Sequence, residues 1–336
     1  MKILSFFTKI LHFLPTEISH KLALEALKAA HLTGLLGLLV PISSKDKIVS
    51  KTNEDNNFLD TLDNKLGLAA GLDKDGEYID CLASLGIGFI ELGTVTPKPQ
   101  KGNPKPRLFR QRESLALVNR MGFNNKGVDR LVEMVKKSKS GIPIGISIGK
   151  NYDTPNEKAY EDYLICLEKV YKYADYVAIN ISSPNTKNLR DLSSKENLEF
   201  LLEVIKNKQV EMSLHFGYKP IYLKISPDES DEGVFMICKS AIDKSIDGII
   251  CSNTSIKHDN LNGYGGLSGK PLSELSTALL KKIRGYVGKD FLLIASGGVM
   301  TKEDYFNKLD AGADLVQIYT GFIFEGPKLI SDIVNS

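Results

Sequence analysis

The chain has 336 residues, which is enough for two average domains or for one large barrel with an appendage. Charged residues make up 25% and hydrophobic residues 42% of it, which excludes a disordered, collagenous or polytopic membrane chain. The formal net charge is only +2, so the molecule as a whole creates no field that would attract nucleic acid. Any anion that this protein binds is therefore expected to be held by a few local groups.

Residues 1–44 differ in pattern from the rest of the chain. Over residues 1–14, apolar side chains recur at helical spacing and polar ones gather on the opposite side, which predicts an amphipathic helix. After Pro15, a second helix is expected from an N-cap at Thr16 toward Gly34. Two interpretations stay open. These helices either pack against the protein's own domain, or lie in a bilayer interface on their Phe and Leu side chains.

Neither an export signal nor a membrane-spanning helix is expected in this region. Lys9 and His12 interrupt the first apolar run, and no small-residue cleavage site follows it. The longest uncharged stretch, residues 29–44, contains Pro41 and is shorter than the roughly 20 apolar residues that a spanning helix needs. The cysteines lack the spacing of a zinc site or a disulfide framework, which favours a reducing compartment: Cys81, Cys166, Cys238 and Cys251.

Short apolar runs alternate with helical segments from about residue 66 onward. The runs predict eight strands, at residues 66–71, 89–92, 142–148, 176–181, 221–225, 248–251, 291–295 and 315–319. Helices are expected between them, for example at residues 157–173, 196–208, 231–244, 273–286 and 302–311. Alternating strands and helices form a parallel sheet, and eight such units fit an α/β fold of the (β/α)8 TIM barrel type better than a doubly wound sheet.

The predicted organisation is a barrel domain over residues 45–336 with a helical appendage over residues 1–44. No G-x-G-x-x-G motif follows the first strand, which argues against a dinucleotide-binding domain. The gap over residues 93–141 is too long for a simple crossover between strands. An inserted loop or hairpin is therefore expected there.

The active site of such a barrel lies at the C-terminal ends of its strands. Gly297 and Gly298 follow the seventh run, and Thr320 follows the eighth, which ends at Tyr319. Backbone N–H groups of a glycine turn, together with the N-terminus of a short helix, are typical of the phosphate site of these barrels. We therefore expect the phosphate group of a ligand at this position.

Two lysines are expected to point into the same mouth, Lys74 and Lys224. Lys224 stands between apolar residues in a predicted strand, so its ammonium group would be buried and would need an anion. A phosphate, a substrate carboxylate or a reduced flavin would supply one. The amides of four asparagines at this end of the barrel suit the edge of a planar amide or urea group: Asn119, Asn180, Asn185 and Asn253.

Ser183 follows the fourth run, where it could act as a nucleophile, as a proton acceptor or as a helix cap. A serine nucleophile usually needs a histidine beside it. None of the five histidines, at positions 12, 20, 31, 215 and 258, lies at a strand end. A Ser-His-Asp hydrolase is therefore disfavoured.

Seven motifs at consistent spacing resemble one family. They are AAGLDKDG (69–76), ELGTVTP (91–97), KPRLFR (105–110), NRMGFNN (119–125), INISSPNT (179–186), GGLSG (265–269) and LVQIY (315–319). The chain resembles the class 2, quinone-dependent dihydroorotate dehydrogenases over nearly its whole length. The resemblance implies a flavoenzyme of pyrimidine biosynthesis that oxidises dihydroorotate to orotate, passes a hydride to FMN and passes electrons on to a membrane quinone.

The resemblance also implies roles for individual residues. Ser183 matches the catalytic base, for which soluble class 1 relatives use Cys. The substrate contacts match Lys74, Asn119, Arg120, Met121, Gly122, Phe123, Asn180, Asn185, Asn253 and Thr254. The FMN contacts match Ala70, Gly71, Leu72, Asp73, Lys74, Thr94, Ser147, Asn180, Lys224, Ser252, Gly269, Gly298, Tyr319 and Thr320. Arg110 and Tyr319 match positions near the quinone tunnel.

Two positions depart from the family pattern. Ser147 stands where the family commonly has an Asn that touches the flavin. Ser252 stands where the family commonly has a Thr. Ser252 keeps the hydroxyl group. Ser147 lacks the amide and its reach, which puts direct contact with FMN in doubt unless a water fills the gap.

The resemblance implies a peripheral protein at the cytoplasmic face of the cell membrane, attached through its N-terminal helices. No metal, no nucleic acid and no obligate protein partner are expected. Two alternatives stay open: another FMN barrel reductase, of the dihydropyrimidine or tRNA-dihydrouridine type, and a membrane-docked scaffold that merely binds a phosphate ligand. Bleaching of a bound flavin by dihydroorotate or by NAD(P)H would distinguish them.

Overall fold

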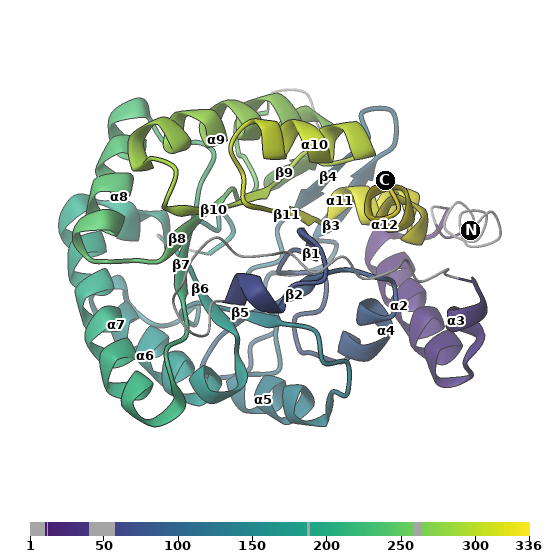
Figure 1. The fold of residues 1–336 in the computed structure, drawn as a ribbon, viewed down its shortest axis with the longest axis horizontal. Helices are drawn as coiled ribbons and strands as arrows, with labels where there is room; N and C mark the ends of the chain where they lie inside the picture. Colours follow the sequence, from purple (N-terminus) through teal and green to yellow (C-terminus); the bar gives the residue numbers. More distant parts are fainter. Residues whose placement is uncertain (1–10, 12, 40–57, 187–188, 259–263) are drawn as a thin grey trace.

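Eight parallel strands close into a barrel, and helices cover its outer face (Figure 1). The strand order around the barrel is β1, β11, β10, β8, β7, β6, β5, β2. The predicted (β/α)8 barrel is therefore confirmed. This computed structural model describes the chain except for residues 1–10, 12, 40–57, 187–188 and 259–263.

Each of the eight expected runs forms one barrel strand. The strands are β1 (Leu66–Leu68), β2 (Phe89–Val95), β5 (Ile144–Ile148), β6 (Tyr176–Asn180), β7 (Ile221–Ile225), β8 (Gly248–Cys251), β10 (Leu292–Ser296) and β11 (Leu315–Ile318). The first strand is shorter than expected because Gly71, with a φ of +101°, lies outside the conformations of a strand. Residues 69–71 form the first loop at the barrel mouth instead.

The five helices expected after the third and later barrel strands are all present. The helices are α2 (Thr16–Leu32), α3 (Leu35–Leu39), α4 (Ile79–Ala83), α5 (Val128–Lys137), α6 (Ala159–Val170), α7 (Lys195–Phe216), α8 (Asp231–Asp243), α9 (Ser273–Val287), α10 (Lys302–Asp310), α11 (Thr320–Glu325) and α12 (Pro327–Val334). α7 is longer than expected and ends only at Gly217, whose φ is +75°. The predicted N-cap at Thr16 is wrong, because Thr16 is already helical and follows Pro15.

Aromatic rings fill the N-terminal end of the barrel. Phe89, Tyr176 and Tyr222 come from β2, β6 and β7 and form one cluster with Phe58 of the short 3₁₀ helix η1 (Phe58–Thr61). The ring centroids of Phe58 and Tyr176 are 5.0 Å apart. A Cβ atom at Gly145 of β5 would lie 2.0 Å from the Tyr176 ring. Only glycine at this position of β5 therefore leaves room for the ring. Ligands are therefore expected at the opposite, C-terminal end.

The long gap between the second and third barrel strands contains the expected hairpin, formed by β3 (Leu108–Gln111) and β4 (Ala116–Asn119). A third strand, β9 (Gly266–Gly269), pairs antiparallel with β4. This small sheet brings Asn119 and Gly269 to the barrel mouth, where both line the same cleft. The hairpin thus adds a wall that the barrel strands alone do not provide.

Helix α2 lies against the side of the barrel, beside α3 and near the C-terminal helix α12 (Figure 1). Its buried residues are Ser19 and Leu24. Polar contacts join α2 to the barrel domain: Arg107 Nε to Glu17 (3.0 Å), Arg110 to Ser19 Oγ (3.1 Å), Tyr78 OH to Glu25 (2.8 Å), His20 Nε2 with the Leu72 carbonyl (3.1 Å) and His31 Nδ1 with Ser84 Oγ (2.8 Å).

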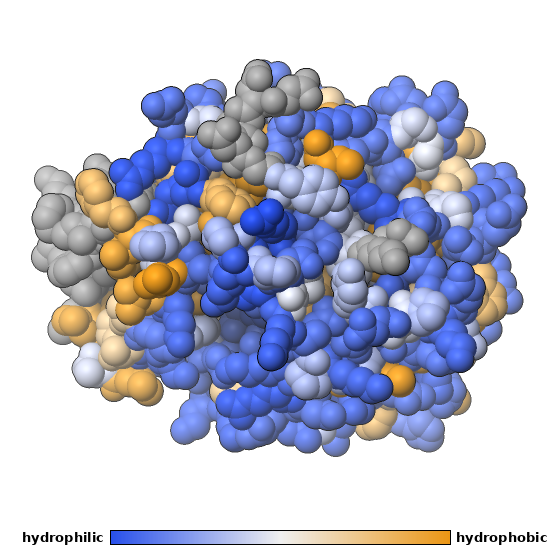
Figure 2. All heavy atoms as spheres, turned by 180° about the vertical axis from the view of Figure 1, so that it is seen from behind, coloured by the Kyte–Doolittle hydropathy of each residue, from blue (hydrophilic) through white to orange (hydrophobic). Residues whose placement is uncertain are grey.

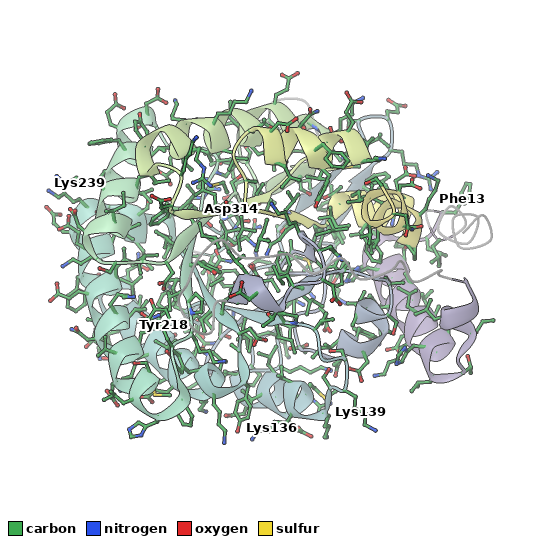
Figure 3. The ribbon with its side chains drawn as sticks, in the orientation of Figure 1. Phe13, Lys136, Lys139, Tyr218, Lys239 and Asp314 are labelled. Atoms are coloured by element: carbon green, nitrogen blue, oxygen red, sulfur yellow. The ribbon has the colours of Figure 1, made fainter. Side chains whose placement is uncertain are left out.

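Apolar side chains gather on the exposed part of this appendage (Figure 2). Phe13 is 79% exposed and Leu32 is 76% exposed, and Phe13 projects from the end of the molecule that carries α2 (Figure 3). The other large exposed apolar side chains here are Leu14, Ile18, Leu22 and Leu35. The helix predicted over residues 1–14 falls almost entirely outside the described residues. Within the described part of the chain, no helix is long and apolar enough to cross a membrane.

Candidate active site

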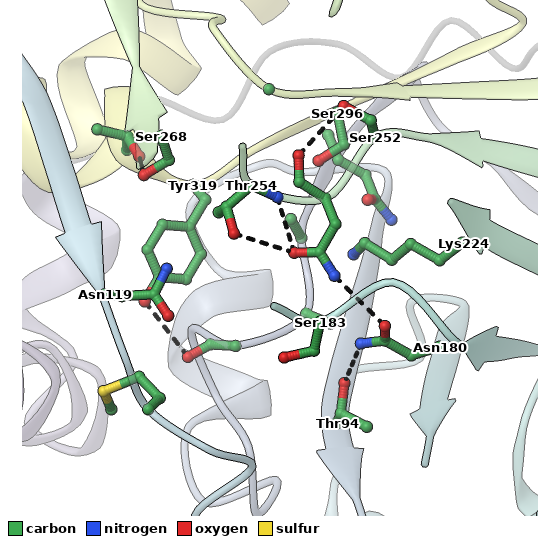
Figure 4. A pocket seen from close by; sticks show the side chains of 18 of the residues that line it. Thr94, Asn119, Asn180, Ser183, Lys224, Ser252, Thr254, Ser268, Ser296 and Tyr319 are labelled. Atoms are coloured by element: carbon green, nitrogen blue, oxygen red, sulfur yellow. Dashed lines mark hydrogen bonds between the residues drawn. The ribbon is translucent and has the colours of Figure 1, made fainter. Parts of the chain in front are cut away.

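A cleft opens at the C-terminal end of the barrel strands. Lys224, Asn180 and Thr94 approach it from one side, Asn119 and Tyr319 from the other, and Ser183 lies between them (Figure 4).

Most of the predicted site residues meet in this one cleft. They are Ala70, Gly71, Lys74, Thr94, Asn119, Met121, Gly122, Phe123, Asn180, Ser183, Asn185, Lys224, Ser252, Asn253, Thr254, Gly269, Gly298, Tyr319 and Thr320. Five predicted residues do not line it: Leu72, Asp73, Arg110, Arg120 and Ser147.

The side chains of Leu72 and Asp73 turn away from the cleft although their neighbours line it. Leu72 packs in the hydrophobic core. The Asp73 carboxylate accepts hydrogen bonds from the backbone N–H groups of Glu77 (2.9 Å) and Tyr78 (2.7 Å), and burial raises its pKa to about 6. Asp73 therefore stabilises the loop that carries Lys74. Its side chain does not reach the cleft, so it is not placed to contact a cofactor there.

The two predicted arginines also point elsewhere. Arg120 donates two hydrogen bonds to the Pro106 carbonyl and lies over the ring of Phe109. Arg110, on β3, donates to Ser19 of α2. Arg110 thus faces the appendage and Tyr319 the cleft, so these two residues mark different sides of the hairpin wall.

Ser147 contributes to the site through Thr94. Its side chain is fully buried, and its Oγ lies 2.9 Å from Thr94 Oγ1. Thr94 in turn accepts a hydrogen bond from Asn180 Nδ2 at 2.8 Å, and Asn253 Nδ2 donates to Asn180 Oδ1 at 3.3 Å. The smaller side chain thus leaves Ser147 behind Thr94, where it orients a chain of polar groups that reaches the cleft.

A second amide pair stands on the hairpin side. Asn185 Nδ2 donates to Asn119 Oδ1 at 3.0 Å, and Asn119 Nδ2 donates to the Gly266 carbonyl at 3.2 Å. Asn185 Oδ1 is buried and has no hydrogen-bond partner within the described part of the chain. Because a buried carbonyl without a donor is costly, this oxygen suits an N–H group of a ligand.

Ser183 is 7% exposed, and its Oγ accepts the Asn185 N–H at 3.3 Å. Three residues further on, Thr186 Oγ1 is buried and unpartnered among the described residues. Lys74 Nζ donates to the Gly71 carbonyl at 2.6 Å. Burial, reinforced by the positive charge of Arg107, lowers the pKa of Lys74 to about 8.

Glycines form the opposite end of the cleft. Gly297 and Gly298, after β10, have φ values of +106° and +76°. A Cβ atom at Gly298 would lie 2.2 Å from the Cα of Ser273, so this loop packs directly on the start of α9. Ser268 Oγ and Thr320 Oγ1 lie 2.8 Å apart beside it. Such a loop presents backbone N–H groups and small hydroxyl groups, which suit a phosphate.

The family model for dihydroorotate dehydrogenase matches residues 55–336. The chain belongs to the dihydroorotate dehydrogenase family. Over 283 residues it is 52% identical to the dihydroorotate dehydrogenase (quinone) of Shewanella sediminis, covering 82% of this chain and 84% of that protein. It is 48% identical over 334 residues to the enzyme of the same name from Acinetobacter baylyi, with 97% of each chain covered.

Solved structures agree with this assignment. The ligand-free DHODH of Eimeria tenella superposes with a TM-score of 0.82 at 32% identity, covering 94% of this chain and 92% of that one. The same enzyme in complex with ferulenol gives a TM-score of 0.82 at 30% identity and covers 95% of this chain and 89% of that one. The predicted family, fold and oxidoreductase class are confirmed. Its family makes the chain a flavoprotein of pyrimidine biosynthesis.

In this dihydroorotate dehydrogenase barrel the anion beside Lys224 is a protein side chain. Lys224 Nζ donates to Glu91 Oε1 at 2.9 Å, and both side chains are buried. Tyr176 OH and Gln317 Nε2 donate to the other oxygen, Glu91 Oε2, at 3.0 and 2.8 Å. The expectation that a ligand must neutralise Lys224 is therefore corrected, because the barrel supplies Glu91 between the aromatic cluster and the cleft.

Replacing Glu91 by glutamine would leave the Lys224 ammonium buried without its anion. We expect Glu91→Gln to lower the free energy of unfolding by about 3 kcal/mol, measured by chemical denaturation of the full chain. Glu133→Gln is the matched control, because Glu133 pairs with Arg130 and Lys137 on the exposed face of α5 and is expected to matter little. An equal, small loss for both variants would contradict the role given to Glu91.

Sequence reasoning missed Glu91 and Gln317 as parts of the site. Gln317 lines the cleft, and its Oε1 is buried without a partner among the described residues. Each is a polar residue between apolar neighbours in a barrel strand, which is the signal that singled out Lys224. The same criterion applied to every strand would have found both. Leu272 and Val299 also line the cleft and carry no such signal.

Proposed function

We propose that this cleft binds FMN and dihydroorotate together, and that the chain oxidises dihydroorotate to orotate with a quinone as the final electron acceptor. One observation supports this most directly. The same cleft holds a glycine loop suited to a phosphate at one end and, at the other, Lys74, Ser183 and an amide cluster with an unpartnered carbonyl. A phosphate-bearing cofactor and a small planar acid fit these two ends.

The residues present fit FMN. Gly297, Gly298 and Gly269 would hold the phosphate group, beside Thr320. Lys224 and the unpartnered Gln317 Oε1 offer a cation and an acceptor to the polar edge of the ring system. When bound, FMN would supply the hydride acceptor, because its ring system accepts a hydride by its own chemistry. The remaining FMN contacts would come from Ala70, Gly71, Lys74, Thr94, Asn180, Ser252 and Tyr319, with Leu72, Asp73 and Ser147 behind them.

Dihydroorotate would lie beneath the hairpin wall. Lys74 provides the cation for its carboxylate, and the asparagine amides provide donors and acceptors for its ring edges. The substrate set is Lys74, Asn119, Met121, Gly122, Phe123, Asn180, Asn185, Asn253 and Thr254, to which Arg120 contributes only its backbone. These groups would orient the C5–C6 bond by holding the carboxylate and the ring edges of the substrate.

Ser183 would accept the C5 proton while the hydride leaves C6. A serine hydroxyl is a weak base at neutral pH, so its own proton must pass onward as it acts. Thr186 Oγ1, three residues further on, is buried and unpartnered in the described part of the chain, and it would relay this proton to a water while giving up its own. The burial of Ser183 keeps bulk water away from the reacting carbon.

The Lys74 ammonium group predicts a pH dependence of orotate binding. Because burial lowers the pKa of Lys74 to about 8, the free site loses this cation as the pH rises through about 8. The dissociation constant of orotate is then expected to rise about tenfold per pH unit above that value. Titration of the flavin spectrum with orotate at about pH 7 to 10 measures it. Lys74→Gln should bind weakly with a flat profile, and a flat wild-type profile would contradict the assignment.

Residues 1–44 would form the segment that contacts the membrane and admits the quinone, and residues 45–336 the FMN-binding barrel. Arg110, which faces α2, and Tyr319, which faces the cleft, would stand along the path between them. The exposed apolar side chains of α2 support attachment as a peripheral protein. The family resemblance favours the cytoplasmic face of the cell membrane. With a net charge of +2, most of that attraction would come from apolar area.

The purified protein tests the cofactor and substrate directly. It should be yellow, release FMN on denaturation and lose its flavin absorbance when dihydroorotate is added without oxygen. Bleaching by NAD(P)H but not by dihydroorotate would favour another FMN barrel reductase instead. A colourless protein that binds only phosphate would favour a scaffold.

A further inference from the structure

Helix α10 carries a buried ammonium group that no part of the proposed mechanism uses. Lys308 is only 1% exposed. Its Nζ donates to Ser276 Oγ at 2.6 Å and to Thr277 Oγ1 at 2.7 Å, and it lies 3.4 Å from the Ser273 carbonyl oxygen. All three partners are neutral oxygens of α9. Among the residues that the structure describes, no carboxylate forms an ion pair with Lys308.

This arrangement is costly for the protein on its own. A buried ammonium group without an anion loses its hydration and gains no opposite charge in return. The nearby carboxylate of Asp304 instead accepts the backbone N–H groups of Met300 and Thr301 and acts on Lys308 only at longer range. Burial lowers the pKa of Lys308 to about 8. Lys224, by contrast, has Glu91 as its anion.

Lys308 lies directly behind the glycine loop of the cleft. Ser276 Oγ accepts the hydrogen bond of Lys308, and its hydroxyl proton is shared between two acceptors, the Gly297 carbonyl at 3.0 Å and the Ser273 carbonyl at 3.1 Å. Two hydrogen bonds therefore connect the ammonium group to this loop. Gly298 packs on Ser273 so closely that no side chain fits between the loop and α9.

The bond from Ser276 also sets the direction of the loop's backbone. In a planar trans peptide the carbonyl and the following N–H point in opposite directions. Because the Gly297 carbonyl points toward α9, the N–H of Gly298 points away from that helix. Gly298 lines the cleft, so this N–H is available to an anion there.

We propose that Lys308 is a positioning residue for the phosphate group of the cofactor. Its buried charge is the fixed counter-charge for a dianion at Gly297 and Gly298, and its hydrogen bond through Ser276 orients the peptide that binds this dianion. The inference rests on the proposed function, which assigns the phosphate of FMN to this loop. It adds a residue that lies outside the cleft and touches no ligand.

The test compares two ligands that differ only in the phosphate. Full-chain protein freed of flavin is titrated with FMN and with riboflavin, and quenching of flavin fluorescence gives both dissociation constants. Lys308→Met is expected to weaken FMN binding by at least about tenfold and to leave riboflavin binding within about twofold. Lys281→Met is the matched control, because it removes an exposed lysine from α9 and should change neither constant.

The stability of the flavin-free protein provides a second measurement. Lys308→Met should melt at the same or a higher temperature than the wild type without flavin, because it removes an uncompensated buried charge. If Lys308→Met does not fold, Lys308→Gln removes the charge and keeps a hydrogen-bond donor, and it should show the same selective loss for FMN. Equal losses for FMN and riboflavin, or none, would overturn the inference. A wild type that prefers FMN no more than riboflavin would instead overturn the proposed phosphate site.

Discussion

Replacing Ser183 by alanine is expected to slow the reduction of bound flavin by dihydroorotate by about 10² to 10⁴-fold. The C5 proton must leave the substrate as the hydride departs, and Ser183 is the hydroxyl group of the 179–186 segment that lines the cleft. The variant loses one oxygen atom and the 3.3 Å hydrogen bond that it accepts from the Asn185 N–H, and it keeps the side-chain amides of the cleft. Orotate binding should therefore change by no more than about threefold.

Stopped-flow measurement of flavin absorbance under anaerobic conditions separates the two effects. Reduction kinetics close to the wild type would rule out Ser183 as the base. A loss of orotate binding as large as the loss in rate would instead assign Ser183 to substrate binding. Ser183→Cys is a useful comparison, because it retains a proton acceptor at the same position and should recover part of the rate as the pH rises.

Removing residues 1–40 is expected to abolish turnover with a long-chain quinone and binding to liposomes, while dihydroorotate still reduces the flavin. The cleft is lined by residues of the barrel, the hairpin and β9, with no contribution from α2 or α3. Reduction of the flavin by dihydroorotate should therefore survive the deletion, and reduction of the quinone should not. Liposome flotation and quinone-dependent dye reduction measure the loss, and anaerobic bleaching measures what remains.

A double variant of the full chain tests the same segment without losing the contacts that α2 makes with the barrel. Leu22→Glu combined with Leu32→Glu places charge on the exposed apolar face and leaves the contacts of Glu17, Ser19 and His20 with the barrel in place. It should release the protein from liposomes and slow turnover with a membrane-embedded quinone. Full quinone turnover in either protein would show that this segment has another role.

The barrel could be predicted from the sequence because each strand is a short apolar run bounded by small or polar residues. β9 could not, because its four residues contain two glycines and no alternation. Its place is set by pairing with β4, which lies far away in the chain. α5 was missed because it falls within the gap that was assigned to an insertion.

The site could be predicted where its residues belong to strands and less well where they belong to loops. Strand geometry forces successive side chains to opposite faces, so Lys224 could be placed in the interior. In the loop after β1 no such rule applies, and Lys74 enters the cleft while Asp73 binds backbone N–H groups behind it. The partner of Lys224 was missed because Glu91 belongs to a strand that is distant in sequence.

Anaerobic reduction and reoxidation of the bound flavin tests the central claim most directly. We predict that stoichiometric dihydroorotate bleaches the flavin with the appearance of orotate, that NAD(P)H does not, and that a short-chain quinone then restores the absorbance. A flavin that dihydroorotate leaves oxidised, or that the quinone cannot reoxidise, would contradict the account.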